Sequence, residues 1–280
     1  MDKKVIIIGT GKVGFALGYA LYQKNYDVYC YDRNLDKLKQ FYRLIKKPLP
    51  QQLPFKDSKI VFITTQDSEI KKTYEEILPH LAPGCIVVHC SGALSRKVFK
   101  TTDRKKIIRA SIHPIQTFVK FNTRSNPFLN IYFGVEADRK ARPYVLKIIK
   151  DLGAQPVFIS PKDKPLYHLV MVLASNYFVT LMNAVQILGA KIRLSQKKLF
   201  KIIEPLIMNT FYNIKNYGAQ NALSGPIKRG DVLTIKTHIK ILKKKAPKLL
   251  KLYSVLGKET VNLSALPSPK KKILKRLFKT

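Results

Sequence analysis

The sequence predicts an α/β protein in which a doubly wound parallel sheet is followed by an all-helical C-terminal domain. Short apolar runs alternate with amphipathic helical patterns as far as residue 160, as strands and helices do around a parallel sheet. From residue 161 onward the strand-like runs stop and long helical patterns replace them. A length of 280 residues also suits two domains, which we expect at residues 1–160 and 161–280.

The first apolar run, residues 5–8, leads directly into a glycine-rich turn with the sequence Gly9-Thr10-Gly11-Lys12-Val13-Gly14. A strand that passes into a helix through this spacing is typical of a dinucleotide-binding site. Gly9 permits a tight turn, Gly11 lets a pyrophosphate approach the backbone, and Gly14 lets the helix pack closely on the strand. The amides that open the helix would bind the anion. The alternative is a glycine-rich turn beside a surface carboxylate.

The second predicted strand, residues 26–31, ends at Asp32, which follows Gly14 by 18 residues. An acid at this position can accept hydrogen bonds from both ribose hydroxyls of an adenosine, and it repels a 2′-phosphate. Arg33 favours NADP instead, because its guanidinium could bind that phosphate. We therefore expect NAD(P) as the cofactor, with NAD preferred.

The same alternation continues after Asp32. We expect a helix over residues 35–45 with Asn34 as its N-cap, and a loop with three prolines over residues 48–54. The remaining expected strands and helices of this domain are, in order, residues 59–65 (strand), 70–81 (helix), 85–90, 107–112 and 131–135 (strands), 141–152 (helix) and 156–159 (strand).

In an open parallel sheet the ligand lies beyond the carboxyl ends of the strands. This rule selects Thr64 and Thr65 to line the cofactor pocket, and Ser91, Gly92 and His113 to reach the reacting end. An imidazole at His113 can exchange the proton that accompanies hydride transfer. Ser91 could orient that imidazole, and Gly92 would let the nicotinamide ring approach. The alternative is that His113 only caps its strand.

The C-terminal domain is expected to consist of helices at residues 165–188, 195–217, 231–243 and 248–264, with a basic tail that is frayed or forms a last helix. Lys164 and His168 are four residues apart and share one face of the first helix. They could bind a substrate carboxylate and donate a proton, or they could be a flanking lysine and an interface histidine.

Two further polar residues of this domain are candidates for substrate binding. Asn176, lower in the first helix, would point to the substrate or form a buried amide hydrogen bond. Arg229 lies in a turn-rich insert, where it either binds a substrate anion or has a structural role.

The composition bears on partners. The formal net charge is +35, from 52 Lys and Arg against 17 Asp and Glu. The sequence contains no basic helix with base-reading side chains, zinc-finger spacing or aromatic RNA-binding motif. We therefore interpret the charge as a solvated surface that binds polyanions at low salt, and expect no dedicated nucleic-acid partner.

The stretch from Leu166 to Ala190 carries no full charge and is long enough to span a membrane. Asn176, Thr180 and Asn183 recur on one helical face, which favours a helix buried inside protein whose polar stripe faces a site or a partner subunit. We expect no membrane span.

Three cysteines, Cys30, Cys85 and Cys90, fall in apolar runs and suggest buried thiols in a reducing compartment. No His, Cys or acidic residues have metal-ligand spacing, so no metal is expected. The first strand begins by residue 5, which leaves no room for a signal peptide and favours a cytoplasmic location.

In combination these residues resemble a two-domain family of uncharacterised Rossmann-like proteins, in which an NAD(P)-binding domain precedes a helical domain of unknown function. The matching stretches are residues 9–14, 89–95, 111–118, 164–168 with 175–177, and 222–231 with His238. More distantly the chain is similar to pyrroline-5-carboxylate reductases, 6-phosphogluconate and β-hydroxyacid dehydrogenases, and prephenate dehydrogenases. The resemblance implies dimerisation through the helical domain.

The distant resemblances imply roles for single residues. Similarity to prephenate dehydrogenases implies a catalytic Ser91 and His113, and similarity to β-hydroxyacid dehydrogenases implies that Lys164 acts at the reacting carbon. His168 stands where the latter enzymes have Asn, which argues against their reaction. We expect an NAD(P)-dependent oxidoreductase that transfers hydride to or from a small carbonyl, imine or hydroxy-acid substrate held between the domains. The alternative is a dinucleotide-sensing or partner-binding module without turnover.

Overall fold

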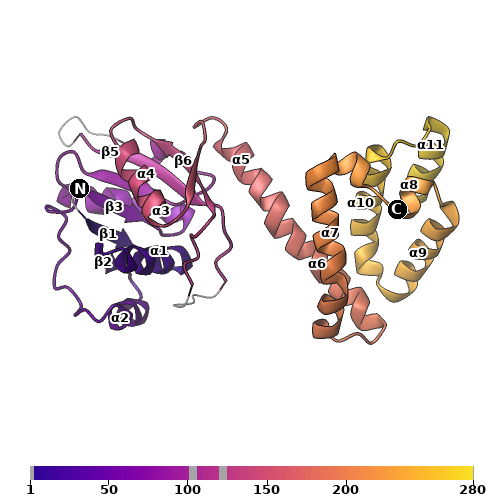
Figure 1. The fold of residues 1–280 in the computed structure, drawn as a ribbon, viewed down its shortest axis with the longest axis horizontal. Coiled ribbons are helices and arrows are strands. Elements are labelled where there is room, and N and C mark those ends of the chain that lie inside the picture. Colours follow the sequence, from indigo (N-terminus) through magenta and orange to yellow (C-terminus); the bar gives the residue numbers. More distant parts are fainter. Residues whose placement is uncertain (1–2, 101–105, 120–124, 280) are drawn as a thin grey trace. The chain divides into compact units, whose positions relative to one another are not determined.

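The computed structural model describes residues 3–100, 106–119 and 125–279. The chain divides into two compact units, Met1–Ala174 and Ser175–Thr280 (Figure 1). The last strand ends at Phe158, close to the end of the domain expected at residue 160. The first unit nevertheless continues into the next helix, because Lys164 in that helix contacts Ser91 and Ser111.

A seven-stranded sheet forms the centre of the first unit, with the strand order β2-β1-β3-β4-β5-β6-β7. Its strands are β1 (Lys4–Ile8), β2 (Asp27–Tyr31), β3 (Ile60–Ile63), β4 (Ile86–His89), β5 (Ile108–Pro114), β6 (Tyr132–Ala137) and β7 (Gln155–Phe158). The predicted doubly wound α/β fold is confirmed.

One strand pair departs from the parallel arrangement that we expected. β6 runs antiparallel to β5, whereas every other neighbouring pair is parallel. A parallel pair needs a crossover connection, usually a helix. The described parts of the connection between β5 and β6, residues 115–119 and 125–131, contain no helix. After β5 the chain therefore turns back, and β6 runs beside β5 in the opposite direction.

Helices cover both faces of the sheet (Figure 1). The alternation of side chains along β1 shows why, since Val5 and Ile7 pack on one face and Ile6 and Ile8 on the other. The first face packs against α1 (Lys12–Gln23), α2 (Leu35–Leu44) and α4 (Arg142–Asp151), and the second against α3 (Asp67–Ile77). Short 3-10 turns lie at η1 (Leu78–His80) and η2 (Arg96–Val98).

Two asparagines mark helix ends in this unit, and one of them, Asn34, is the N-cap that the sequence predicted. The side chain of Asn34 accepts a hydrogen bond from Lys37 N and caps α2. Asn25 has a φ of +59°, the left-handed conformation that ends α1. β2 pairs in parallel with β1, with Tyr31 opposite Ile8, so Asp32 lies just beyond the end of β1.

The second unit is helical throughout its described residues. The last helix of the first unit, α5 (Lys164–Met171), continues through a π turn, η3 (Val172–Asn176), into α6 (Tyr177–Lys191) of the second. Then follow α7 (Gln196–Ala222), α8 (Gly225–Arg229), α9 (Val232–Lys245), η4 (Pro247–Leu249), α10 (Leu250–Leu263) and α11 (Ser268–Leu277). The basic tail thus forms a last helix, and it is anchored because Leu274 and Phe278 join Ile235 and Val261 in a small core.

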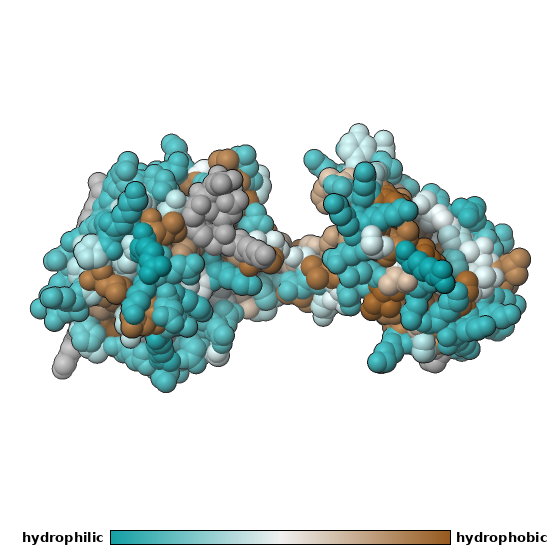
Figure 2. Space-filling view, turned by 90° about the horizontal axis from the view of Figure 1, so that it is seen from below, coloured by the Kyte–Doolittle hydropathy of each residue, from teal (hydrophilic) through white to brown (hydrophobic). Residues whose placement is uncertain are grey.

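We expected the apolar stretch after Lys164 to be buried inside the protein, and within this chain it is not. The helix Lys164–Lys191 is long and apolar enough to cross a membrane by length and composition, with only 6% of its apolar window buried. A single helix of this kind is weak evidence for a membrane span. Hydrophobic side chains gather on the surface of the helical unit (Figure 2). Exposed examples on α6 and α7 are Tyr177, Phe178, Val179, Leu206, Phe211 and Tyr212.

Candidate active site

The glycine turn joins β1 to α1 through a backbone that requires glycine. Gly9 has a φ of +97°, a conformation that residues with a Cβ rarely adopt. A Cβ at Gly14 would collide with the carbonyl oxygen of Gly9 and the hydroxyl of Thr64. Thr64 Oγ1 donates a hydrogen bond to Gly9 O at 2.6 Å. The turn is thereby held against β3, and the first amides of α1 are left for an anion.

A pocket of about 360 Å³ lies at the carboxyl ends of β1, β2 and β3. Of the residues predicted to bind a cofactor, it is lined by Gly9, Gly11, Asp32, Arg33, Thr64 and Thr65. The other predicted residues of the turn, Thr10, Lys12, Val13 and Gly14, continue from the pocket into α1. Lys37, Gln66, Glu69, Thr73 and Glu76 complete most of its wall.

Two features of this pocket fit a dinucleotide. A Cβ built on Gly11 meets no atom within 4 Å, so the backbone of the turn is open to a bulky anion. Thr65 has a buried hydroxyl without a hydrogen-bond partner among the described residues. A buried hydroxyl without a partner is rare in folded proteins. Here it lies in a residue of the pocket wall, where a ligand could supply the missing hydrogen bond.

Asp32 ties the end of β2 to the glycine turn. Its Oδ2 accepts hydrogen bonds from Thr10 N at 2.5 Å and Thr10 Oγ1 at 2.8 Å, and its Oδ1 accepts one from Asn34 N at 2.8 Å. Burial raises the pKa of Asp32, but the hydrogen bonds from Asn34 and Thr10 outweigh this effect and lower the pKa below its ordinary value. The carboxylate is ionised and keeps only about one of its four lone pairs free.

Arg33 is directed toward α3. Its Nη2 lies 3.3 Å from Glu76 Oε1, and its Nη1 lies 3.7 Å from Glu69 Oε2. Sequence reasoning weighed Arg33 only against Asp32 and overlooked these two acids. Their spacing of seven residues on a predicted helix was the available signal, because it puts both on one helical face.

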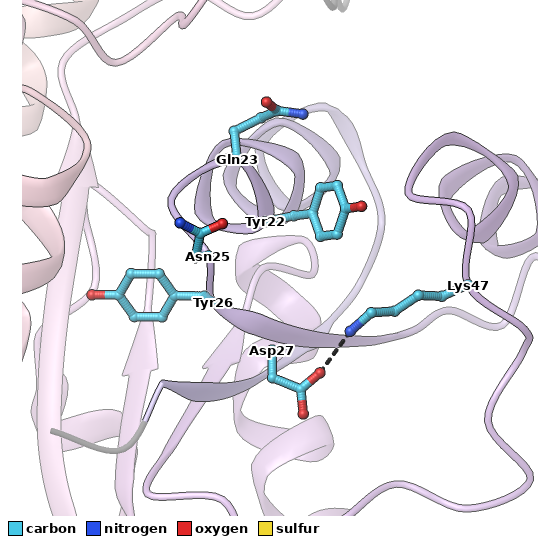
Figure 3. A pocket seen from close by; sticks show the side chains of 6 residues that line it. All are labelled: Tyr22, Gln23, Asn25, Tyr26, Asp27 and Lys47. Atoms are coloured by element: carbon cyan, nitrogen blue, oxygen red, sulfur yellow. Dashed lines mark hydrogen bonds and ion pairs between the residues drawn. The ribbon is translucent and has the colours of Figure 1, made fainter.

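A second pocket, of about 430 Å³, lies at the other end of β2 (Figure 3). Asp27, the first residue of β2, forms an ion pair with Lys47 at 2.7 Å there. The hydroxyl of Tyr26 donates a hydrogen bond to Asp151 at 2.6 Å. These groups are satisfied within the chain, and the pocket lies at the amino end of the strand, where ligands of such sheets do not bind.

His113 lies near the end of β5, and its imidazole is bonded by Tyr167 of α5. The distance from His113 Nδ1 to Tyr167 Oη is 2.8 Å. Burial, together with the charges of Lys164 and His168, lowers the pKa of His113 to about 4. The imidazole is therefore neutral at pH 7.

Sequence reasoning did not select Tyr167. The register of the sheet explains its position, because His113 of β5 pairs with Gly134 of β6. A Cβ at Gly134 would lie 2.7 Å from Tyr167 Cζ, so only glycine leaves room for the tyrosine ring beside His113. The available signal was that Tyr167 follows Lys164 by three residues, so that the two lie on one helical face.

Gly92 and His168 complete the surroundings of the imidazole. A Cβ at Gly92 would lie 3.0 Å from His113 Nε2 and 2.7 Å from His168 Cδ2. The ring centroids of the two histidines are 6.2 Å apart. With Nδ1 bonded to Tyr167, Nε2 is the nitrogen of His113 that faces the Gly92 backbone.

Lys164 is almost fully buried, with 2% of the side chain exposed. Its Nζ donates hydrogen bonds to Ser91 O at 3.2 Å and to Ser111 Oγ, and lies 4.0 Å from Glu136 Oε2. Burial lowers the pKa of Lys164 to about 8, against the opposing charge of Glu136. The amine therefore joins α5 to the segment after β4, at Ser91, and to the middle of β5, at Ser111.

Ser91 has other partners than the histidine it was expected to orient. Its Oγ donates to Asp67 Oδ2 at 2.7 Å and accepts from the amides of Ala93 and Leu94 at 3.2 and 3.0 Å. A serine after a strand commonly bonds amides two and three residues on. Ser91 thus fixes the turn that carries Gly92.

An ion network around the buried Glu136 lies beside β5 and β6. Glu136 of β6 pairs with Arg96 Nη1 at 2.5 Å and accepts a hydrogen bond from Ser95 Oγ at 2.7 Å. Asp138 bonds both Arg96 Nε at 2.8 Å and Arg109 Nε at 3.1 Å. The network ties the segment after β4 to β5 and β6.

The two substrate-binding candidates of the helical unit are Asn176, in the π turn, and Arg229, at the end of α8. Both side chains are exposed. Their predicted roles stay predictions.

Two family models match the chain. Residues 4–111 match the NAD binding domain of 6-phosphogluconate dehydrogenase, and residues 131–260 match a domain of unknown function, DUF2520. No curated protein matches the sequence.

Several solved structures share the fold over nearly the whole chain. A protein from Bacteroides fragilis, named as a candidate NADP oxidoreductase, is 21% identical over 93% of this chain and 98% of its own, with a TM-score of 0.75. Protein TM1727 from Thermotoga maritima is 25% identical over 97% of this chain and 98% of its own, with a TM-score of 0.66. A pyrroline-5-carboxylate reductase from Coxiella burnetii is 17% identical over the full length of both chains, with a TM-score of 0.57.

The two family models follow one another along the chain, and the second begins within the sheet, since residues 131–260 include β6, α4 and β7 as well as helices of the second unit. The chain matches the two-domain Rossmann family that its sequence resembles, in which an NAD-binding domain of the 6-phosphogluconate dehydrogenase type precedes a DUF2520 domain.

Proposed function

We propose that the protein is an NAD(P)-dependent oxidoreductase that transfers a hydride to or from a small carbonyl, imine or hydroxy-acid substrate. One observation carries the proposal: a glycine turn suited to a dinucleotide and a neutral imidazole lie at the carboxyl ends of strands of one sheet. Solved structures of similar fold include a pyrroline-5-carboxylate reductase and an imine reductase.

The residues of the turn and its pocket would hold the dinucleotide. The amides from Gly9 to Gly14 would bind the pyrophosphate, Asp32 the adenosine ribose, and the unpaired hydroxyl of Thr65 a further polar group of the ligand. The bound dinucleotide supplies the hydride carrier. NAD is the preferred form in this proposal.

His113 is the proposed acid/base. Its Nδ1 is engaged by Tyr167, so Nε2 exchanges the proton with the substrate. Because the pKa of His113 is about 4, the neutral ring accepts the hydroxyl proton when the substrate is oxidised and returns it in the reverse direction. His168 is the proposed substrate-side group. We propose Ser91 and Lys164 as positioning residues, since their polar atoms are engaged by Asp67, Ser111 and the backbone.

A second copy of the chain is the proposed cover for the apolar side chains of α6 and α7. Large exposed apolar patches mark association sites on soluble proteins. A homodimer formed through the helical unit would bury residues such as Phe211 and Leu206, which are 64% and 66% exposed. A cytoplasmic location remains part of the same proposal.

Calorimetric titration with NADH and NADPH tests the cofactor, and binding of neither would overturn the proposal. The reduced-nicotinamide absorbance, followed with a panel of small carbonyls, imines and hydroxy acids, then tests turnover. The His113→Ala variant should keep its dinucleotide affinity and lose about 100-fold or more of its turnover. Binding without turnover of any such substrate would favour the dinucleotide-sensing alternative.

A further inference from the structure

Arg33 is held by two glutamates within the cofactor pocket. Glu69 and Glu76 lie on α3 seven residues apart, about two helical turns, and so share one face. The guanidinium of Arg33 spans both, at 3.7 Å from Glu69 and 3.3 Å from Glu76. All three residues line the same pocket as Asp32. The positive group next to Asp32 is therefore already paired.

The charges around this part of the pocket decide which ribose it accepts. Asp32, Glu69 and Glu76 contribute three carboxylates, against the two cations Arg33 and Lys37. NADP carries a phosphate on the adenosine ribose where NAD carries the 2′-hydroxyl. A guanidinium binds a phosphate by directing its paired N–H donors at the oxygens. Here those donors face carboxylates, and the carboxylates themselves repel a phosphate.

We propose that Glu69 and Glu76 are specificity-determining residues, which hold Arg33 away from a 2′-phosphate and thereby make NAD the preferred dinucleotide. The inference rests on the proposed NAD(P)-dependent function. It assigns selectivity to α3 in addition to Asp32, whose carboxylate is largely engaged by Thr10 and Asn34.

The strength of the effect follows from exposure. The side chains of Arg33, Glu69 and Glu76 are 63%, 41% and 50% exposed, and exposed ion pairs are weak. Removing both glutamates would break two such pairs and remove the repulsion of a phosphate. We therefore expect the ratio of NADP to NAD affinity to change by about tenfold.

The test is calorimetric binding of NAD and NADP to the full chain and to the double variant E69Q/E76Q. NADP should bind the double variant about tenfold more tightly than the wild type, with NAD affinity changed by less than about twofold. Adding Arg33→Ala to the double variant should remove most of that gain, because Arg33 is the group that is released and only the removed repulsion remains.

The matched control is Glu75→Gln on the same helix. Glu75 pairs with Lys71 at 3.9 Å and is not part of the pocket wall, so E75Q removes one negative charge from the same helix, where the double variant removes two, and does not release Arg33. The inference is overturned if E75Q gives the same gain, if the gain survives Arg33→Ala, or if the NADP to NAD ratio does not move. Binding of neither dinucleotide to the wild type would overturn the proposed function as well, whereas binding with an unmoved ratio would overturn this inference alone.

Discussion

The nucleotide end and the reacting end of the candidate site lie along one edge of the sheet, yet they are built in opposite ways. At the nucleotide end, Gly11 faces open space and the Thr65 hydroxyl has no partner among the described residues. At the reacting end, Lys164 and Glu136 are about 2% exposed and bonded to their neighbours. The first end leaves polar groups for a ligand, and the second uses its polar groups to hold the fold. Substitutions at the nucleotide end should therefore mainly lower dinucleotide affinity, and substitutions at the reacting end should mainly lower the stability of the fold.

Lys164→Ala should show the largest effect on stability. It leaves a cavity and removes one cation from a buried network, which typically costs about 3 kcal/mol of unfolding free energy or more. Urea unfolding together with hydrogen exchange at β5 measures the loss. Lys162→Ala, an exposed neighbour, is the control and should cost less than about 0.5 kcal/mol. Equal stability of K164A and wild type would show that the reacting end does not depend on this amine.

Acid should destabilise the reacting end before the nucleotide end. Burial lowers the pKa of His113 to about 4 and that of His89 to about 3, from ordinary values of 6.5. Below pH 6.5 the unfolded chain therefore binds protons that the folded chain does not, and stability falls as the pH drops toward 4. The pKa of Asp32 is lowered because hydrogen bonds stabilise its charged form, whereas burial of the histidines disfavours theirs. The stability that Asp32 contributes is lost only as the pH falls below 4.

Unfolding at pH 7 and 4.5 measures this effect. His113 should account for about 2 kcal/mol of the difference in unfolding free energy between the two pH values, a figure already reduced because the side chain is half-buried. His113→Asn should remove this contribution. The exposed His80→Asn variant is the control. A pH dependence that is the same in H113N and wild type would contradict the assignment.

Tyr167→Phe should have a smaller effect, confined to the imidazole. The phenyl ring still fits over Gly134, but the hydrogen bond to His113 Nδ1 is lost, which is worth about 1 kcal/mol. We expect about tenfold lower turnover, unchanged dinucleotide affinity and an altered His113 tautomer in ¹⁵N NMR spectra. Tyr177→Phe, exposed in α6, should change none of these. An unaltered tautomer would mean that Tyr167 does not position the ring.

The same contrast explains what the sequence could predict. The glycine turn and Asp32 are recognisable because each follows a strand directly, and their spacing carries the chemistry. The fold class followed from the alternation of apolar runs with helical patterns. The antiparallel β6 did not, since a strand pattern contains no direction.

The reacting end was harder because its contacts join distant segments. Tyr167 meets His113 across 54 residues, through a gap that depends on the pairing of Gly134 with His113. Ser91 was expected to orient His113, but the local amides and Asp67 engage its hydroxyl first. The pattern of a polar helical face could not distinguish a lysine that faces substrate from one that is buried against the sheet.

Thr65→Val should have the smallest effect on stability and provide the sharpest test of the comparison. The hydroxyl is buried and has no hydrogen-bond partner in the described part of the chain, so replacing it with a methyl of the same shape should leave stability unchanged or raise it by up to about 1 kcal/mol. Dinucleotide affinity should fall by about five- to tenfold, since the ligand loses one hydrogen bond. Thr117→Val, exposed after β5, is the control for both measurements. A loss of stability without a loss of affinity would make Thr65 part of the fold, and the nucleotide end would then resemble the reacting end.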